Sequence, residues 1–124
     1  LDDYVEEKGI EKVDFLKIDV EGFESNVLKG ASKLIQQENL IIFVEIVEKN
    51  LISANSSARE IFELLESNGY KAWMIDRADY VLKPINDNNY QNGVNFIFVK
   101  ESNILVVDRV KNLEGNSLQA PLAI

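Results

Sequence analysis

Three carboxylates crowd into one nine-residue stretch of the chain, KIDVEGFES at residues 17–25. Asp19, Glu21 and Glu24 come directly after apolar residues that favour burial, and each carboxylate is costly to desolvate unless a partner compensates it. Such a group can hold Mg²⁺ through its oxygens, act as a general base on a hydroxyl, or bind a cationic cofactor. The stretch is therefore either a solvated acidic corner or a site that acts on a ligand.

The composition of the 124 residues limits this chemistry. There is no cysteine and no histidine, which excludes disulfides, thiolate nucleophiles, Cys-ligated zinc and imidazole bases. The formal charge of −8 disfavours nucleic acid as a partner, because a duplex-binding surface needs basic residues. No apolar run in this segment is long enough to span a bilayer. The balance of 46% apolar and 27% charged residues is typical of a globular protein, which we expect in the cytoplasm.

Apolar spacing predicts strands and helices in alternation. Strands are indicated by runs rich in β-branched and apolar residues, at 13–19, 40–47, 70–75, 80–83 and 94–99. Helices are indicated by apolar residues at helical spacing and by capping residues, at 1–9, at 23 to about 37, and after 55–57 up to Asn68. This order predicts an α/β fold whose parallel strands give way to an antiparallel edge.

Asp19 and Glu45 fall at or near the carboxyl ends of two predicted strands. Open α/β sheets bind ligands outside the carboxyl ends of their strands, so the two carboxylates face one crevice if these strands are neighbours. A charge inside a strand is costly, and Glu45 therefore indicates a crevice or a paired lysine. Glu21 and Glu24 would lie in the first helical turn, where negative charge is favourable. We favour a functional role for Asp19, a structural one for Glu24 and an ion pair between Lys17 and Asp19.

The stretch belongs to a longer pattern, VDFLKIDVEGFESNVLKGA at residues 13–31, with LDDYVEEKGI before it and VEI in the next apolar strand. This pattern resembles the FkbM-type S-adenosylmethionine-dependent methyltransferases, and its most specific part is KIDVEGFE. The helix EIFELLESNGY and the strand VNFIFVK also resemble the closing elements of that family, so the resemblance covers residues 1 to about 100.

The resemblance implies a Rossmann-like methyltransferase sheet of seven strands with an antiparallel last strand. On this alignment the predicted strands at 13–19, 40–47, 70–75 and 94–99 are the fourth to the seventh, so the first three would precede Leu1. The glycine-rich cofactor loop would also precede Leu1, because the six glycines of the chain never cluster. We therefore expect residues 1–100 to be the C-terminal half of a methyltransferase domain, inactive as an isolated fragment, and 101–124 to be an extension or tail.

The resemblance also implies roles for the carboxylates. Asp19 matches the aspartate beside the methyl end of S-adenosylmethionine and the acceptor, so we expect it to contact the cofactor and, with Glu21, to be catalytic. We place Glu45 and Glu24 as candidates on the substrate side. The expected reaction is methyl transfer to a hydroxyl of a small molecule or glycan, in which a carboxylate orients the acceptor and takes its proton. Mg²⁺ could assist by activating the hydroxyl.

Two other functions stay open from the sequence. The carboxylates of Asp19, Glu21 and Glu45 would suit a divalent-metal enzyme, such as a phosphoester hydrolase. Alternatively, the chain is a non-catalytic fragment or binding module, because half of a doubly wound sheet exposes the edge where its first strand should pair.

Overall fold

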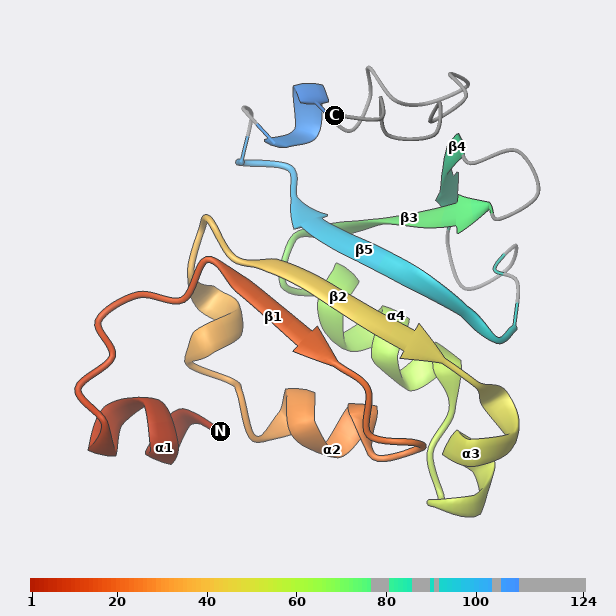
Figure 1. Ribbon diagram of the computed structural model, residues 1–124, viewed down its shortest axis with the longest axis horizontal. Coiled ribbons are helices and arrows are strands. Elements are labelled where there is room, and N and C mark those ends of the chain that lie inside the picture. Colours follow the sequence, from red (N-terminus) through yellow and green to blue (C-terminus); the bar gives the residue numbers. More distant parts are fainter. Residues whose placement is uncertain (77–80, 86–89, 91, 104–105, 110–124) are drawn as a thin grey trace, which may run out of the picture.

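A mixed sheet of five strands organises the chain (Figure 1), whose computed structural model describes residues 1–76, 81–85, 90, 92–103 and 106–109. The strands are β1 (Phe15–Ile18), β2 (Ile41–Ile46), β3 (Tyr70–Asp76), β4 (Val81–Ile85) and β5 (Val94–Lys100). The helices are α1 (Asp2–Glu7), α2 (Glu24–Lys29), the 3-10 helix η1 (Leu34–Gln36), α3 (Glu48–Ser53) and α4 (Ala58–Glu66). The predicted α/β class is confirmed.

The spatial order of the strands is β1-β2-β5-β3-β4. β1 and β2 are parallel, whereas β5 runs antiparallel to both of its neighbours, β2 and β3, and β3 pairs antiparallel with β4. Each predicted strand is present. The first is shorter than the predicted 13–19, and residue 80 of the predicted 80–83 strand lies outside the described residues.

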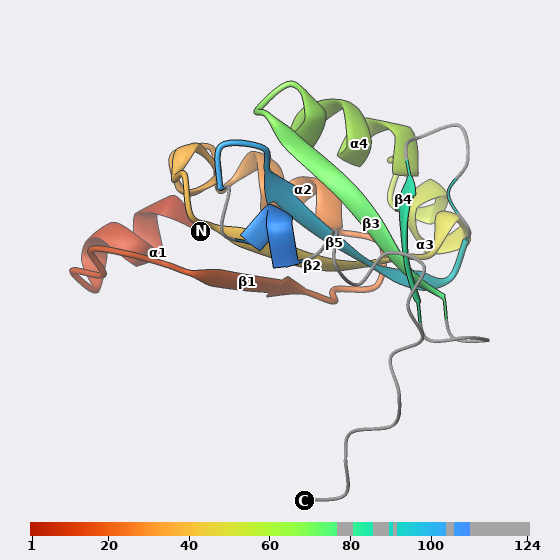
Figure 2. The ribbon, with the colours of Figure 1, turned by 90° about the horizontal axis from the view of Figure 1, so that it is seen from above.

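One face of the sheet is covered by helices α2, α3 and α4, which lie on the same side of it (Figure 2). The core forms between this face and the helices, because side chains alternate between the two faces of a strand. The buried side chains from the sheet and from α2 and α4 include Ile42, Val44, Ile46, Leu28, Ile61, Phe62 and Leu65.

We call the opposite side the open face of the sheet. It carries the alternate residues of three strands, Phe15, Lys17, Ile41, Phe43, Glu45 and Ile97. A helical turn at residues 106–109 covers part of it, where Val107 packs with Trp73 and Val99. Nearer β1 the face is accessible, and Phe15 is 54% exposed.

Helix α4 begins where the sequence predicts a cap. The Ser57 hydroxyl accepts a hydrogen bond from the backbone N–H of Glu60 at 3.3 Å, which satisfies one of the free N–H groups of the first turn. The helix then buries Ile61 and Phe62 against the sheet. Its nine residues make it the longest described helix, and no helix in the described ranges has the length and apolar content to cross a bilayer.

The single helix predicted from residue 23 to about 37 is wrong. Helix α2 ends at Lys29, and after a turn the chain forms the separate η1. Gly30 is the C-cap of α2, and the Asp2 carboxylate fixes the start of η1, because it accepts hydrogen bonds from the backbone N–H groups of Lys33 at 2.8 Å and Leu34 at 3.0 Å. Desolvation would raise the pKa of Asp2, but these hydrogen bonds outweigh it and lower the pKa.

The chain beyond β5 is described only in part. Of the predicted tail 101–124, residues 101–103 are described and residues 106–109 form the helical turn, whereas 104–105 and 110–124 lie outside the described residues. The domain boundary at residue 100 stays a prediction.

Candidate carboxylate site at the ends of two parallel strands

Asp19 and Glu45 lie at the same end of neighbouring strands. The last paired residues of β1 and β2 are Ile18 and Val44, so the parallel register places Asp19 beside Glu45 one residue further on. The strands are neighbours, as a shared crevice requires. The Asp19 carboxylate also contacts the Lys17 ammonium at 3.3 Å, which is the ion pair predicted from the sequence, and Lys17 belongs to the open face.

The two carboxylates therefore share the open face at the carboxyl ends of β1 and β2. The side chain of Asp19 is 46% exposed, and Glu45 is partly buried between Val44 and Ile46. Behind them the open face carries apolar rings beside Lys17, since Phe43 packs on Phe15 with ring centroids 6.3 Å apart. Two carboxylates and one ammonium leave a net negative charge beside these rings, which favours a ligand with a positive centre and an apolar part.

Glu21 occupies an unusual backbone conformation in the turn between β1 and α2. Its φ of +50° lies in the left-handed region, which non-glycine residues adopt rarely, and Gly22 follows with φ of +111°. Glu21 is exposed, so its carboxylate is accessible at the same end of the sheet as Asp19.

Glu24 lies in the first turn of α2, but its side chain does not face solvent. It is 3% exposed, and its carboxylate accepts hydrogen bonds from the backbone N–H of Gly22 at 3.0 and 3.1 Å and of Val20 at 3.3 Å. The sequence indicated that a negative charge is favourable at the start of this helix. It did not indicate the hydrogen bonds from Val20 and Gly22, because these depend on the geometry of the turn.

Helix α3 follows β2 at the same end of the sheet and was not predicted from the sequence. Leu51 is its one buried side chain among the six residues, so its apolar periodicity is weak. Hydrogen bonds from distant segments hold it instead. The Asn92 side chain accepts from the Glu48 backbone N–H at 2.7 Å, and the Tyr90 hydroxyl donates to the Glu48 carboxylate at 2.9 Å. Burial and this carboxylate raise the pKa of Tyr90. No spacing along the sequence could have indicated these contacts.

Comparisons with known proteins decide the family. The model of the methyltransferase FkbM domain matches residues 1–72, a stretch that includes Asp19, Glu21, Glu24 and Glu45. The chain belongs to the FkbM methyltransferase family. No solved structure matches this FkbM chain.

One curated relative of the FkbM chain is the 2-O-methyltransferase NoeI of Sinorhizobium fredii (strain NBRC 101917 / NGR234), 33% identical over 67 residues. The match covers 54% of this chain and 27% of the relative. The FkbM chain thus corresponds to only a minor part of that protein's length.

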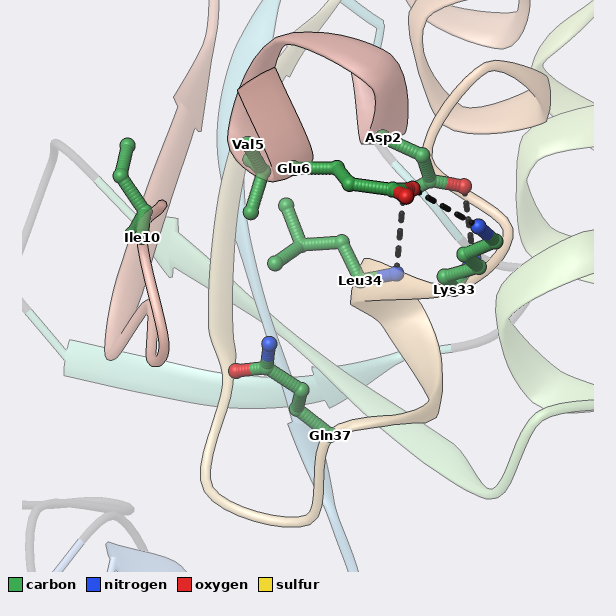
Figure 3. Close-up of a pocket in the computed structure, with 7 residues that line it drawn as sticks. All are labelled: Asp2, Val5, Glu6, Ile10, Lys33, Leu34 and Gln37. Carbon is green, nitrogen blue, oxygen red and sulfur yellow. Dashed lines mark hydrogen bonds and ion pairs between the residues drawn. The ribbon is translucent and has the colours of Figure 1, made fainter. Parts of the chain in front are cut away.

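A cavity of about 200 Å³ lies between α1 and η1 (Figure 3), away from the carboxylates that follow β1. Its charged side chains already have partners within the protein. The Lys33 ammonium pairs with the Glu6 carboxylate at 3.1 Å, and the Asp2 carboxylate accepts from the backbone around Lys33. In this FkbM chain the cavity is therefore part of the interface between α1 and η1.

A metal centre is not indicated by the described residues, which contain no group of three carboxylates close enough to hold an ion. Asp19, Glu21 and Glu45 are among the residues described. The alternative of a divalent-metal enzyme, which depended on these three carboxylates alone, is not favoured for the FkbM chain.

Proposed function

We propose that this chain is part of an S-adenosylmethionine-dependent O-methyltransferase that acts on a hydroxyl of a small molecule or sugar. The observation that carries the proposal is the shared position of Asp19 and Glu45 on the open face, at the carboxyl ends of parallel neighbours, within the segment that matches the FkbM domain. Open α/β sheets bind their ligands at this end. The name of the relative, a 2-O-methyltransferase, supports a hydroxyl as the acceptor.

The described residues suit one end of the cofactor. S-adenosylmethionine, when bound, supplies a methyl group carried by a positively charged sulfonium. The carboxylates of Asp19, Glu21 and Glu45 would provide the negative potential that such a cation needs. The described glycines are scattered along the chain and form no glycine-rich loop, so we propose that the rest of the cofactor is held by another part of a longer polypeptide.

The Asp19 carboxylate can both orient the acceptor hydroxyl and take its proton. A carboxylate accepts a hydrogen bond from a hydroxyl, which fixes the direction of its oxygen, and it takes the proton when that oxygen forms a new bond. Lys17 holds the Asp19 carboxylate at 3.3 Å and thereby restricts its orientation. We propose Asp19 as orienting residue and base, Glu21 as the second catalytic carboxylate and Glu45 as a contact on the acceptor side.

The edge of the sheet supports a longer methyltransferase domain. The Ile41 N–H donates to the carbonyl of Asp14, so the backbone groups of Asp14 face β2. Because successive residues of a strand direct their backbone groups to opposite sides, the N–H and C=O groups of Phe15 and Lys17 face away from β2. In the described part of the chain β1 is the edge strand on this side. An open edge beside an exposed apolar face favours a further strand. We propose that three more strands continue the sheet from β1, as in a Rossmann-like methyltransferase.

The test uses the full-length protein that contains this chain. Calorimetry should detect S-adenosylmethionine binding, and transfer of a labelled methyl group to a panel of hydroxyl acceptors should be measurable. Asp19→Asn should lower turnover by about 10²- to 10⁴-fold, the usual contribution of a general base. Asp14→Asn is a matched control, because Asp14 also pairs with a lysine, Lys12, two residues away, but precedes β1 at its other end.

Asp14→Asn should leave turnover unchanged. Turnover that is unchanged in Asp19→Asn would contradict the role given to Asp19. A full-length protein that binds no S-adenosylmethionine would contradict the proposed function itself.

A further inference from the structure

Glu24 is a buried carboxylate that accepts hydrogen bonds from the backbone of the turn before its helix. Its two oxygens receive the N–H groups of Val20 and Gly22 over distances of 3.0 to 3.3 Å. With 3% of its surface exposed, the side chain has no access to a ligand at the rim of the sheet. A buried carboxylate is costly unless hydrogen bonds compensate it, and here backbone amides provide that compensation.

The residue between these two amides is Glu21. Its left-handed φ of +50° is unfavourable for a residue with a Cβ, and such conformations persist only where surrounding contacts hold them. The Glu24 carboxylate holds the backbone on both sides of Glu21. The conformation that directs the exposed Glu21 side chain therefore depends on Glu24.

We propose that Glu24 is a positioning residue that acts through Glu21. Its carboxylate closes the turn at residues 20–22, and the closed turn presents the Glu21 carboxylate at the carboxyl end of β1. This inference rests on the proposed function, because it assigns Glu24 to the support of a catalytic carboxylate instead of to the substrate side.

Glutamine is the informative replacement at position 24. It keeps the length and shape of the side chain but has one acceptor oxygen, and its amide group would oppose the Gly22 N–H with another donor. Glu24→Gln should therefore open the turn while leaving the volume of the buried side chain unchanged.

The first test is a double-mutant cycle in the full-length protein, with kcat as the readout. Glu21→Gln and Glu24→Gln should each lower kcat by about tenfold or more, because each removes or misdirects a carboxylate that assists proton transfer. The double variant should have a kcat within about twofold of Glu21→Gln alone, since residues that act as a unit are not additive. A double variant whose loss equals the product of the two single losses would overturn the proposal.

The second test does not depend on catalysis. In amide hydrogen exchange of the full-length protein, the Gly22 and Val20 amides should be protected in the wild type and should exchange faster in Glu24→Gln, because both donate to the Glu24 carboxylate. The Gly69 amide is the matched control, because Gly69 also has a positive φ, of +85°, but donates to the backbone carbonyl of Glu66. If Glu24→Gln leaves the exchange of Gly22 and Val20 unchanged, Glu24 does not hold the turn and the inference fails.

The two tests separate this inference from the proposed function. A protein without methyl transfer would refute the proposed function, and with it the catalytic purpose of the turn. Amide hydrogen exchange would still decide whether Glu24 fixes the conformation around Glu21.

Discussion

Gly22 lies directly against Asn50, so close that a Cβ atom at Gly22 would come within 2.4 Å of the Asn50 carbonyl oxygen. The turn after β1 and the helix α3 after β2 are therefore in backbone contact. Glycine is required at position 22 for this approach and also for its φ of +111°. The glycine of the KIDVEGFE motif thus joins the two loops at the carboxyl ends of the parallel strands.

Gly22→Ala should destabilise the fold by about 2 to 4 kcal/mol, because it combines a strained backbone with overpacking against Asn50. Urea denaturation measures the loss. Gly69→Ala is the matched control, with φ of +85° and no atom within 4 Å of the added Cβ. It isolates the backbone strain, so equal losses in the two variants would contradict the packing of Gly22 on α3.

Phe62→Ala should cost about 3 to 5 kcal/mol, the usual loss for a fully buried aromatic ring. The ring lies on α4 between Phe96 and Phe98, with centroid distances of 5.8 and 5.4 Å. Phe23→Ala, which truncates a side chain that is 57% exposed, should change stability by about 0.5 kcal/mol or less. Denaturation of both variants checks the assignment of the core, which is wrong if Phe62 behaves like Phe23.

The stability of the protein should depend on Glu60 in acid. Hydrogen bonds from the Lys29 ammonium and then the Ser56 hydroxyl lower the pKa of Glu60 to about 2 from a usual 4.5. Since the folded pKa is below the unfolded one, the stabilisation is complete above about pH 4.5 and is lost as the pH falls towards 2.

Urea denaturation at a series of pH values should show this dependence in the wild type. The difference in stability between the wild type and Glu60→Gln should shrink from pH 5 to pH 2. Lys29→Gln should remove most of the same dependence, because Lys29 is the main cause of the lowered pKa. Wild-type and Glu60→Gln curves that stay parallel over this range would show that the pair contributes nothing.

The isolated chain should self-associate through the edge of β1, where an unpaired strand borders an apolar surface. Phe15→Lys should reduce this association, because a charge on an edge strand opposes pairing with another strand. Sedimentation velocity at increasing concentration measures it. Phe23→Lys is the control, since Phe23 is as exposed as Phe15 but lies outside the strand, and an equal effect of both substitutions would refute the role of the edge.

Local sequence signals predicted most of the elements, and long-range contacts explain the failures. The apolar runs of β2 and β5 and the capping serine of α4 are local, and these elements occur where predicted. The start of η1 depends on Asp2, which is 31 residues from Lys33. Helix α3 depends on Asn92, 44 residues from Glu48. Neither contact leaves a pattern within a window of the sequence.

The sequence predicted where the carboxylates of the site lie along the strands, but not all of the groups that they contact. The strand periodicity placed Asp19 and Glu45 at strand ends, and the parallel register brings them side by side. The burial of Glu24 could not be predicted, because an acidic residue at a helix start is usually exposed. Its contacts require the left-handed turn at Glu21, a conformation that local propensity disfavours.

The position of β5 has a consequence for biosynthesis. β5 is the last described strand in the sequence, yet it pairs between β2 and β3. A nascent chain that has reached only residue 93 can form two ribbons, β1 with β2 and β3 with β4, but among the described strands only β5 pairs with both of them. Residues 94–100 must leave the ribosome before the sheet becomes continuous, so folding depends on late, non-local pairing, which is slow. A premature stop codon anywhere before β5 would therefore leave a chain without the strand that makes the sheet continuous.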